Sequence, residues 1–307
     1  MGATAEPNFF IVGAPKAGTT ALWTYLRQHP QIFMSTLKEP QFFASDIRGN
    51  QRNITNLPDY LELFRGAQQP AIGEASTCYL GSPAAPREIK TFCQQARIII
   101  MLRNPIDVMY AQHSECVFDG TEHIADFRTA LDSMETRVWR SGRCRGQPVQ
   151  RLGYRELVKF SQQVRSFLEA FGRPNVHIIV YDDFAADSAE VYRSVLTFLG
   201  VSPSHECSFD VVHANRTIRS SAIQDLLRHP PNLVKRFTRA FLTKRARTGL
   251  GHRLNRINTR VVVRPMLDPE FRRRLETDFI SEVQQLGHLV GRDLSSWVSS
   301  TASSRPV

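Results

Sequence analysis

Residues 9–30, FFIVGAPKAGTTALWTYLRQHP, predict a strand, a loop and a helix in direct succession. The apolar run Phe9–Val12 has the length and composition of a short buried strand. The segment 19–30 carries apolar side chains at helical spacing, with Thr19 as a possible N-terminal cap and Pro30 as its end. A strand that enters a helix through a glycine-containing loop is typical of the first unit of an α/β fold.

Further strands and helices alternate along the chain. RIIIML (97–102) and VHIIVY (176–181) are typical of strands buried on both faces. Helical patterns are found at about 83–95, 153–171, 189–200 and 268–289. This alternation predicts an α/β fold with a P-loop-like central parallel β-sheet flanked by helices. We expect a single domain over residues 1–307, with a basic helical segment at about 228–264 and a polar tail from about 299.

The composition is that of a soluble globular protein, with 42% hydrophobic and 22% charged residues. No run approaches the roughly 18 apolar residues of a membrane-spanning helix. The strand at 9–12 begins too early to leave room for a signal peptide, so we expect a cytoplasmic location. The five cysteines are scattered and form no Cys-x-x-Cys pair, which argues against a disulfide framework and a zinc site. No metal is expected.

The net charge of +10 is concentrated in one segment. Residues 228–264 contain eleven lysines and arginines and no acid, whereas the rest of the chain has 28 basic and 29 acidic residues. Apolar side chains interleave these cations, so the segment fits an amphipathic surface helix with a solvated basic face. Such a patch also attracts an anionic partner or surface.

The loop between the first strand and helix has the glycine spacing of a phosphate-binding P-loop. Its amide groups converge on a helix N-terminus, where the helix dipole favours an anion. Lys16 lies inside the loop, and two threonines follow Gly18 where a nucleoside triphosphatase needs Lys-Ser/Thr. The strand 97–102 ends in Arg103, where a magnesium-dependent enzyme of that class places an acid. The pattern predicts a phosphate site unlike that of a magnesium-dependent P-loop enzyme.

Residues 9–45, FFIVGAPKAGTTALWTYLRQHPQIFMSTLKEPQFFAS, resemble the N-terminus of the sulfotransferases that use 3′-phosphoadenosine 5′-phosphosulfate (PAPS). The branch they resemble includes bacterial and heparan-sulfate-type enzymes. The resemblance continues over nearly the whole chain, through residues 98–115, 171–201, 215–228 and 286–297. It implies the sulfotransferase fold, PAPS as the donor and adenosine 3′,5′-bisphosphate (PAP) as the product.

The resemblance also implies the donor-binding residues. Those expected at the 5′-phosphosulfate are Lys16, Ala17, Gly18, Thr19 and Thr20. The Lys16 cation is expected near the bridging oxygen, where negative charge grows as the S–O bond breaks. Arg103 matches the arginine that holds the 3′-phosphate, Tyr181 matches a tyrosine that meets the nucleotide, and Arg219 with Ser220 resembles the basic loop that closes over that phosphate.

One position departs from the family pattern. The family has a serine eight residues after the arginine, where this chain has Ala111. Ser114 lies one helical turn further along. Either Ser114 substitutes from the same helix face, or the hydrogen bond to the 3′-phosphate is lost.

Sulfuryl transfer to an alcohol needs a base that removes the hydroxyl proton. Glu39, in the stretch KEPQFF, matches the glutamate that heparan-sulfate-type enzymes place opposite the phosphosulfate loop, and Pro40 stiffens its backbone. The alternative is a solvated Lys38–Glu39 pair on a surface loop. Glu74, in GEAST, is a second carboxylate, expected either to line the site or pair with Lys16, or to be a satisfied acid at a strand end.

Histidines are the alternative bases, because the phenol and steroid enzymes of the wider family use one. His29 ends a predicted helix and is expected to be structural. His113 and His123 lie on or after the helix that follows Arg103, and neither sits in a matching motif.

The leading hypothesis is a PAPS-dependent sulfotransferase acting on a hydroxyl of a glycan, a lipid or a small molecule. The basic segment favours an anionic glycan or lipid as acceptor and a peripheral contact with an anionic membrane surface. A P-loop nucleotide kinase or NTPase is the first alternative, and a non-catalytic polyanion-binding protein is the second. The segment lacks the features of a known nucleic-acid module, so no nucleic-acid partner is expected.

Overall fold

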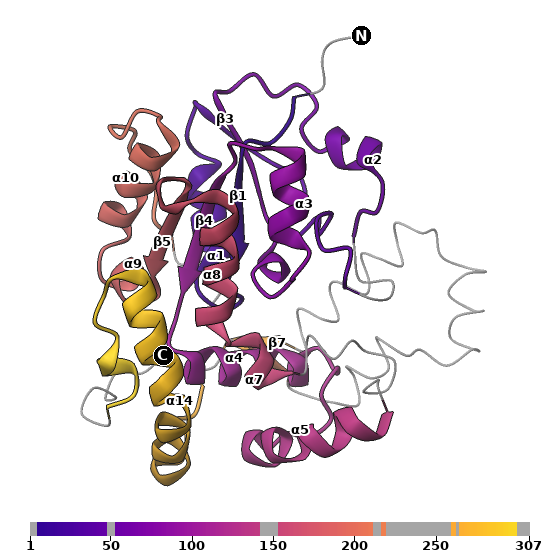
Figure 1. Ribbon diagram of the computed structural model, residues 1–307, viewed down its shortest axis with the longest axis vertical. Coiled ribbons are helices and arrows are strands. Elements are labelled where there is room, and N and C mark those ends of the chain that lie inside the picture. Colours follow the sequence, from indigo (N-terminus) through magenta and orange to yellow (C-terminus); the bar gives the residue numbers. More distant parts are fainter. Residues whose placement is uncertain are drawn as a thin grey trace, which may run out of the picture.

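The centre of the protein is a five-stranded parallel β-sheet (Figure 1). The structure is a computed structural model that describes residues 5–47, 53–141, 153–210, 216–218, 259–261 and 264–299. The strands of the sheet are β1 (Phe9–Gly13), β2 (Ile32–Met34), β3 (Ala71–Ala75), β4 (Arg97–Leu102) and β5 (Val176–Val180). Their order is β2-β3-β1-β4-β5, and every neighbouring pair is parallel. The predicted α/β fold with a central parallel sheet is confirmed.

Helices cover the sheet (Figure 1). The α-helices are α1 (Thr19–Leu26), α2 (Leu57–Glu62), α3 (Ala85–Phe92), α4 (Pro105–Phe118), α5 (Phe127–Ser141), α7 (Tyr154–Leu157), α8 (Phe160–Phe171), α9 (Tyr181–Ala186), α10 (Ser188–Leu199) and α14 (Pro269–Val290). The 3-10 helices are η1 (Thr77–Tyr79), η2 (Arg173–Asn175) and η3 (Ser295–Trp297), and β6 (Arg216–Ile218) pairs antiparallel with β7 (Thr259–Val261). Because parallel crossovers are right-handed, α1 lies on the face opposite to α3 and α8, which pack together.

The first strand forms the middle of the core. Every residue of β1 is buried, as its uninterrupted apolar sequence predicts for a central parallel strand. Phe9 lies across β3 at Gly73, where an added Cβ would come within 2.3 Å of the Phe9 ring. A glycine is therefore required at this position of β3.

Two predicted helix boundaries are wrong. Helix α1 ends at Leu26 rather than at Pro30, because the chain then tightens: the amides of residues 28 and 29 each bond the carbonyl three residues back. Thr19 is not the cap of α1. Gly18 takes that position in the left-handed conformation (φ 90°) and provides no side-chain cap.

The predicted helix 153–171 divides into α7 and α8, while the other long helices match their predictions. Helix α10 ends at Gly200 in the left-handed conformation, and α14 begins after Asp268, whose side chain accepts a hydrogen bond from the Phe271 amide. Helix α14 packs against α8 and α4 (Figure 1), and the segment after it bonds Asn104 and Asp182 through Trp297.

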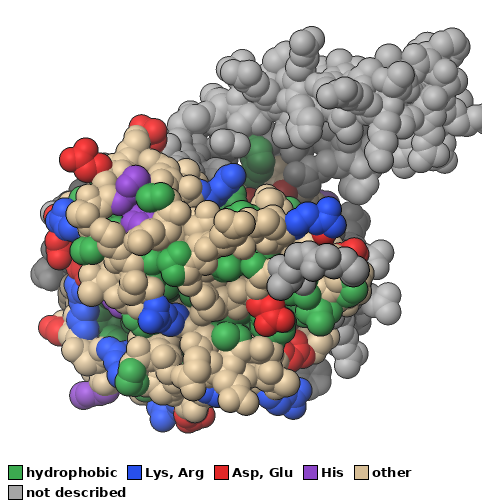
Figure 2. Space-filling view, turned by 90° about the horizontal axis from the view of Figure 1, so that it is seen from above, with side chains coloured by type: hydrophobic (Ala, Val, Ile, Leu, Met, Phe, Trp, Pro, Cys, Tyr) green, Lys and Arg blue, Asp and Glu red, His purple; other side chains and the backbone are tan. Residues whose placement is uncertain are grey.

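The described surface has no concentrated charge on the face seen in Figure 2. Lysine and arginine side chains there alternate with acidic and apolar ones. This distribution agrees with a body whose charges nearly balance outside residues 228–264. Within the part of the chain that the structure describes, no helix combines the length and apolar character needed to cross a membrane.

Candidate active site

The predicted site residues gather where the strands of the sheet end. The loop with Lys16 follows β1, Ser76 and Thr77 follow β3, Arg103 follows β4 and Tyr181 follows β5. Parallel strands place these carboxyl ends at one edge of the sheet, where ligands of α/β proteins bind. Four segments far apart in sequence therefore contribute to one site.

The loop after β1 is held close to its neighbours by backbone that favours glycine. Gly13 (φ 144°) and Gly18 (φ 90°) both have positive φ angles, and an added Cβ would lie 2.8 Å from Leu80 at Gly13 and 3.2 Å from Phe184 at Gly18. Lys16 is also in the left-handed region, with φ 60°. A loop fixed in this way presents its amides at the α1 N-terminus, as an anion site requires.

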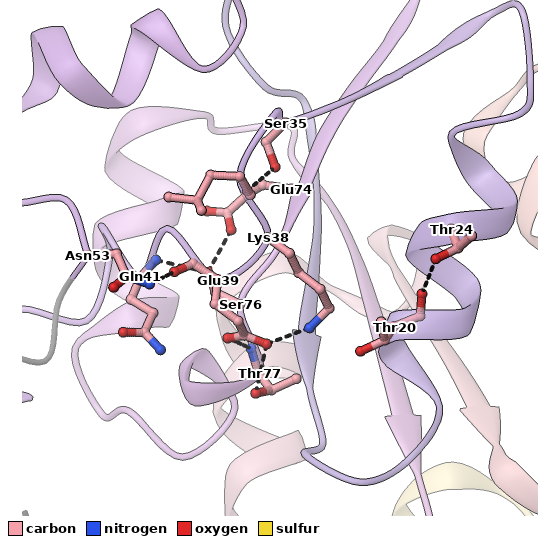
Figure 3. Close-up of polar contacts among 11 residues, drawn as sticks. Thr20, Thr24, Ser35, Lys38, Glu39, Gln41, Asn53, Glu74, Ser76 and Thr77 are labelled. Atoms are coloured by element: carbon pink, nitrogen blue, oxygen red, sulfur yellow. Dashed lines mark hydrogen bonds and ion pairs between the residues drawn. The ribbon is translucent and has the colours of Figure 1, made fainter. Parts of the chain in front are cut away.

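Lys16 contacts a carboxylate that the sequence analysis did not consider. Its Nζ lies 2.6 Å from Oε2 of Glu115 on α4, and the two side chains are 28% and 48% exposed. The predicted pairing of Lys16 with Glu74 is wrong, because Glu74 is completely buried among other partners. Of the loop threonines, Thr19 is buried, and the Thr20 carbonyl accepts a hydrogen bond from Thr24 Oγ1 at 2.9 Å (Figure 3).

Arg103 and Tyr181 are in direct contact, as two residues of one ligand site should be. The Arg103 guanidinium lies 4.4 Å from the centre of the Tyr181 ring. Its Nη1 also donates to the Lys16 carbonyl at 3.1 Å, which ties the end of β4 to the loop after β1. Arg103 is only 8% exposed, so its charge is largely removed from water.

Ser114 is bound to an arginine that the sequence analysis missed. Arg264 Nε donates to Ser114 Oγ at 3.0 Å, and its guanidinium lies 5.3 Å from the centre of the Tyr110 ring. Burial and the neighbouring Arg103 lower the pKa of Arg264. Arg264 is one of the eleven cations of the basic segment and was not among the predicted site residues. No local sequence signal could have found it, because only the packing of α14 on α4 brings this part of the chain to Ser114.

The geometry favours one of the two alternatives for the missing serine. Ala111 is buried at 3% exposure, whereas Ser114 Oγ lies beside an arginine and donates to the Tyr110 carbonyl at 2.9 Å. Ser114 therefore lies beside a pair of neighbouring cations, Arg264 and Arg103. The predicted residues Arg219 and Ser220 lie outside the described residues, as does most of the basic segment.

The Glu39 carboxylate is fixed by several donors (Figure 3). Its Oε2 accepts from the Thr77 amide at 2.9 Å, and its Oε1 accepts from Thr77 Oγ1 at 3.1 Å and lies 2.6 Å from Lys38 Nζ. The predicted Lys38–Glu39 pair exists, but the two side chains are only 18% and 25% exposed. Glu39 is thus a partly buried carboxylate with a defined position, unlike a solvated surface acid.

Glu74 is fully buried at the end of β3. Its carboxyl group accepts hydrogen bonds from Tyr60 (3.0 Å), Tyr79 (2.7 Å) and Ser76 (2.7 Å). Burial raises the pKa of Glu74 to about 7, even though these hydrogen bonds lower it. Of the two readings of Glu74, the satisfied strand-end acid is the one the structure supports.

Of the three candidate histidines, two are hydrogen-bonded to backbone groups and the third is exposed to solvent. His29 Nδ1 accepts from the Gln31 amide at 3.1 Å, so its Nε2 carries the hydrogen and donates to the Ser202 carbonyl at 2.9 Å. These contacts agree with the structural role predicted for His29. The buried His113 contacts the Ile124 carbonyl through Nε2 at 2.9 Å, and His123 is exposed.

Together these features define a class of protein. A parallel α/β sheet carries the glycine-containing loop with Lys16 after its central strand β1 and the buried Arg103 after the neighbouring strand β4, and Arg264 is bound to Ser114 of α4. Cations gathered in two places in this way are typical of sites for ligands with two anionic groups. Among the described residues, no group of three or more His, Cys, Asp or Glu is placed to hold a metal ion.

Comparisons with known proteins identify the family. A family model described as "Sulfotransferase domain" matches residues 6–240. The chain is 24% identical over 254 residues to carbohydrate sulfotransferase 15 of Mus musculus, covering 65% of this chain and 45% of that protein. It is 28% identical over 211 residues to bifunctional heparan sulfate N-deacetylase/N-sulfotransferase 4 of Mus musculus, covering 66% and 23%. The chain thus spans less than half the length of these two relatives.

A solved structure agrees over almost the whole chain. The crystal structure of a sulfotransferase from Alicyclobacillus acidocaldarius superposes with a TM-score of 0.72 at 28% identity, covering 96% of this chain and all of that one. The chain therefore belongs to the sulfotransferase family, whose sulfuryl donor is PAPS. The resemblance predicted from the sequence is confirmed.

Proposed function

We propose that the protein transfers the sulfuryl group of PAPS to a hydroxyl group of a carbohydrate and releases PAP. The proposal rests on one observation above all. The loop with Lys16 and the fixed carboxylate of Glu39 lie at the ends of the adjacent strands β1 and β3, so a leaving-group cation and a proton acceptor belong to one site. The names of the relatives, which are carbohydrate and heparan sulfate enzymes, support the acceptor class.

The reaction needs one bond to form and one to break. The acceptor oxygen forms a bond to sulfur while the bridging S–O bond of the donor breaks, and Glu39 takes the hydroxyl proton. The Lys16 ammonium stabilises the negative charge that develops on the departing phosphate oxygen. Thr77 and Lys38 hold the Glu39 carboxylate in a fixed orientation and keep it available as a proton acceptor.

The donor fits the cations of the site. The loop amides and Lys16 suit the 5′-phosphosulfate, with Ala17, Gly18, Thr19 and Thr20 completing the loop. Arg103 and Arg264 suit the 3′-phosphate, because each has an aromatic ring beneath its guanidinium and their mutual repulsion falls when an anion binds between them. Arg219, Ser220 and the basic segment remain candidates for contacts with the donor and with an anionic glycan acceptor.

Calorimetry decides between this function and the nucleotide kinase alternative. PAP should bind without magnesium, whereas ATP with magnesium should bind weakly, because the strand end carries Arg103 rather than an acid. Tight binding of magnesium–ATP and none of PAP would overturn the proposal.

The acceptor is tested with radiolabelled [35S]PAPS. Desulfated heparan sulfate and chondroitin should become labelled, and 2-naphthol serves as the phenolic comparison. Transfer to the phenol alone would reject the carbohydrate acceptor.

E39Q should bind PAP normally and transfer the label at least ~10²-fold more slowly, because it keeps the size of the side chain and loses its basicity. Full activity in E39Q, with loss in H113A or H123A, would assign the base to a histidine.

A further inference from the structure

The segment that carries Glu39 has a backbone that needs outside support. Glu39 and Gln41 both lie in the left-handed region, with φ 61° and 58°. For residues other than glycine such conformations are strained and persist only where the surroundings hold them. The support comes from the end of β3: the Glu39 amide donates to the Ala75 carbonyl at 2.8 Å, and the Gln41 amide donates to Ser76 Oγ at 3.0 Å.

The buried carboxyl group of Glu74 lies behind this support (Figure 3). Ser76 Oγ accepts from the Gln41 amide and donates its own hydrogen to Glu74 at 2.7 Å. Tyr79 makes the same kind of connection two residues further along the segment. Its hydroxyl donates to Glu74 at 2.7 Å and accepts from the Phe43 amide at 3.3 Å. Glu74 therefore orients two hydroxyl groups whose lone pairs hold the backbone just after Pro40, at the amides of Gln41 and Phe43.

We propose that Glu74 is a positioning residue for sulfuryl transfer, which acts through Ser76 and Tyr79 to hold the Glu39 segment in its reactive conformation. This inference rests on the proposed function, in which Glu39 is the base. We call the hydrogen bonds from the Gln41 and Phe43 amides through Ser76 and Tyr79 to Glu74 the relay. A buried acid that only filled space would need no relay, since Tyr60 and the apolar core already enclose it. The two relayed hydrogen bonds lead to the loop that carries Glu39, the base of the proposed function.

The protonation state of Glu74 should determine how well the relay holds the Glu39 segment, so the effect of the relay should depend on pH. The groups that face it are Tyr60 from α2, Tyr79 and Cys78 from η1, and the Glu39 carboxylate, and none of them is a cation. Burial raises the pKa of Glu74 to about 7, and the charge of Glu39 adds to the rise. Above that pH the carboxylate accepts the hydroxyl hydrogens and leaves the lone pairs for the backbone amides. Below it, the acid proton competes for one of those lone pairs.

Three substitutions that each remove one hydrogen bond to Glu74 separate positioning from simple stability. S76A and Y79F break the relay to the Glu39 segment, whereas Y60F removes a hydroxyl that bonds Glu74 alone and is the matched control. We expect kcat for [35S]PAPS and desulfated heparan sulfate to fall about tenfold in S76A and severalfold in Y79F, with the KM for PAPS unchanged. Y60F should lose stability and keep its kcat.

The pH profile supplies a second readout. In the wild type, kcat should rise as the pH passes through about 7, and this step should be absent in E74Q, whose side chain does not titrate. Equal kcat in S76A, Y79F and Y60F, or a step that persists in E74Q, would overturn the positioning role.

A further comparison separates failure of this inference from failure of the proposed function. If E39Q keeps full activity, the assignment of the base is wrong and the positioning role falls with it. If E39Q is inactive while S76A keeps its full kcat, only the positioning role is wrong. If no glycan is labelled, amide hydrogen exchange at Gln41 and Phe43 decides the matter. Faster exchange in S76A and Y79F than in Y60F supports the relay, and equal rates in all three contradict it.

Discussion

The two sides of the active site differ in how firmly their key side chains are held. On the donor side, the Lys16 ammonium contacts Glu115 in an ion pair that solvent reaches. On the other side, Glu39 accepts two hydrogen bonds from Thr77 and is backed by the fully buried Glu74. An exposed ion pair is worth about 0–1 kcal/mol, so Lys16 can exchange its partner for an incoming anion. The Glu39 carboxylate has a fixed position, which suits a group that must meet an acceptor in one orientation.

The largest effect should come from removing the exchangeable cation. K16A should lower kcat by ~10²–10³, because one electrostatic contact to the leaving group is lost. Its thermal stability should stay close to that of the wild type, since the Lys16 ion pair is partly exposed and contributes little to folding. Single-turnover transfer from [35S]PAPS measures the first quantity and a melting curve the second.

A surface lysine provides the control for this substitution. K159A removes a lysine that pairs with Glu156 on the surface and should leave kcat unchanged. Near-normal turnover in K16A would remove Lys16 from the mechanism and erase the contrast between the two sides.

The buried side should respond to pH through its stability. The folded-state pKa of Glu74 is raised from 4.5 to about 7, so the folded protein keeps a proton that the unfolded chain releases. The contribution of Glu74 is therefore most favourable below about pH 4.5 and is lost as the pH rises to about 7. A shift of this size corresponds to roughly 3 kcal/mol. Urea unfolding of the wild type and E74Q at several pH values measures it as a change in their difference, and parallel curves would contradict it.

A smaller effect should distinguish Ser114 from Ala111. S114A and R264K should each weaken PAP binding by about tenfold, because each removes a hydrogen bond that involves a charged group or orients one. Adenosine 5′-phosphosulfate, which lacks the 3′-phosphate, should bind both variants as well as the wild type. A111S is the control and should not tighten binding, since position 111 is buried. Tighter binding in A111S with no change in S114A would show that the family hydrogen bond is simply missing.

The sequence predicts residues of short local motifs better than contacts that depend on tertiary packing, for a physical reason. Lys16, Arg103 and the glycines lie in short motifs directly after apolar strands, so local pattern is enough to place them. Arg264 escaped prediction because its partner Ser114 is distant in sequence and only the packing of α14 on α4 brings them together. The cytoplasmic location and the contact with an anionic membrane stay predictions.

Glu74 is a residue that the sequence identified but whose surroundings it could not predict. The residue was recognised as a candidate, but its partners belong to separate elements: Tyr60 lies on α2 and Tyr79 on η1. Burial decides what a carboxylate does, and burial is a property of the assembled core. Sequence alone could therefore not choose between a pairing with Lys16 and an enclosed acid.

The smallest effect should come from substituting Glu115, the ion-pair partner of Lys16. Glu115 follows Ser114 on α4, so its negative charge lies beside both the loop lysine and the cluster of arginines that suits the 3′-phosphate. E115Q keeps the shape of the side chain and removes this charge, which competes with the donor for Lys16. Since an exposed ion pair is worth up to about 1 kcal/mol, PAP should bind E115Q up to about fivefold more tightly. The gain should shrink at high salt, because solvent-exposed charges are screened. Calorimetry at low and high ionic strength measures both, and weaker binding in E115Q would mean that Glu115 helps to place Lys16 for the donor rather than holding it back.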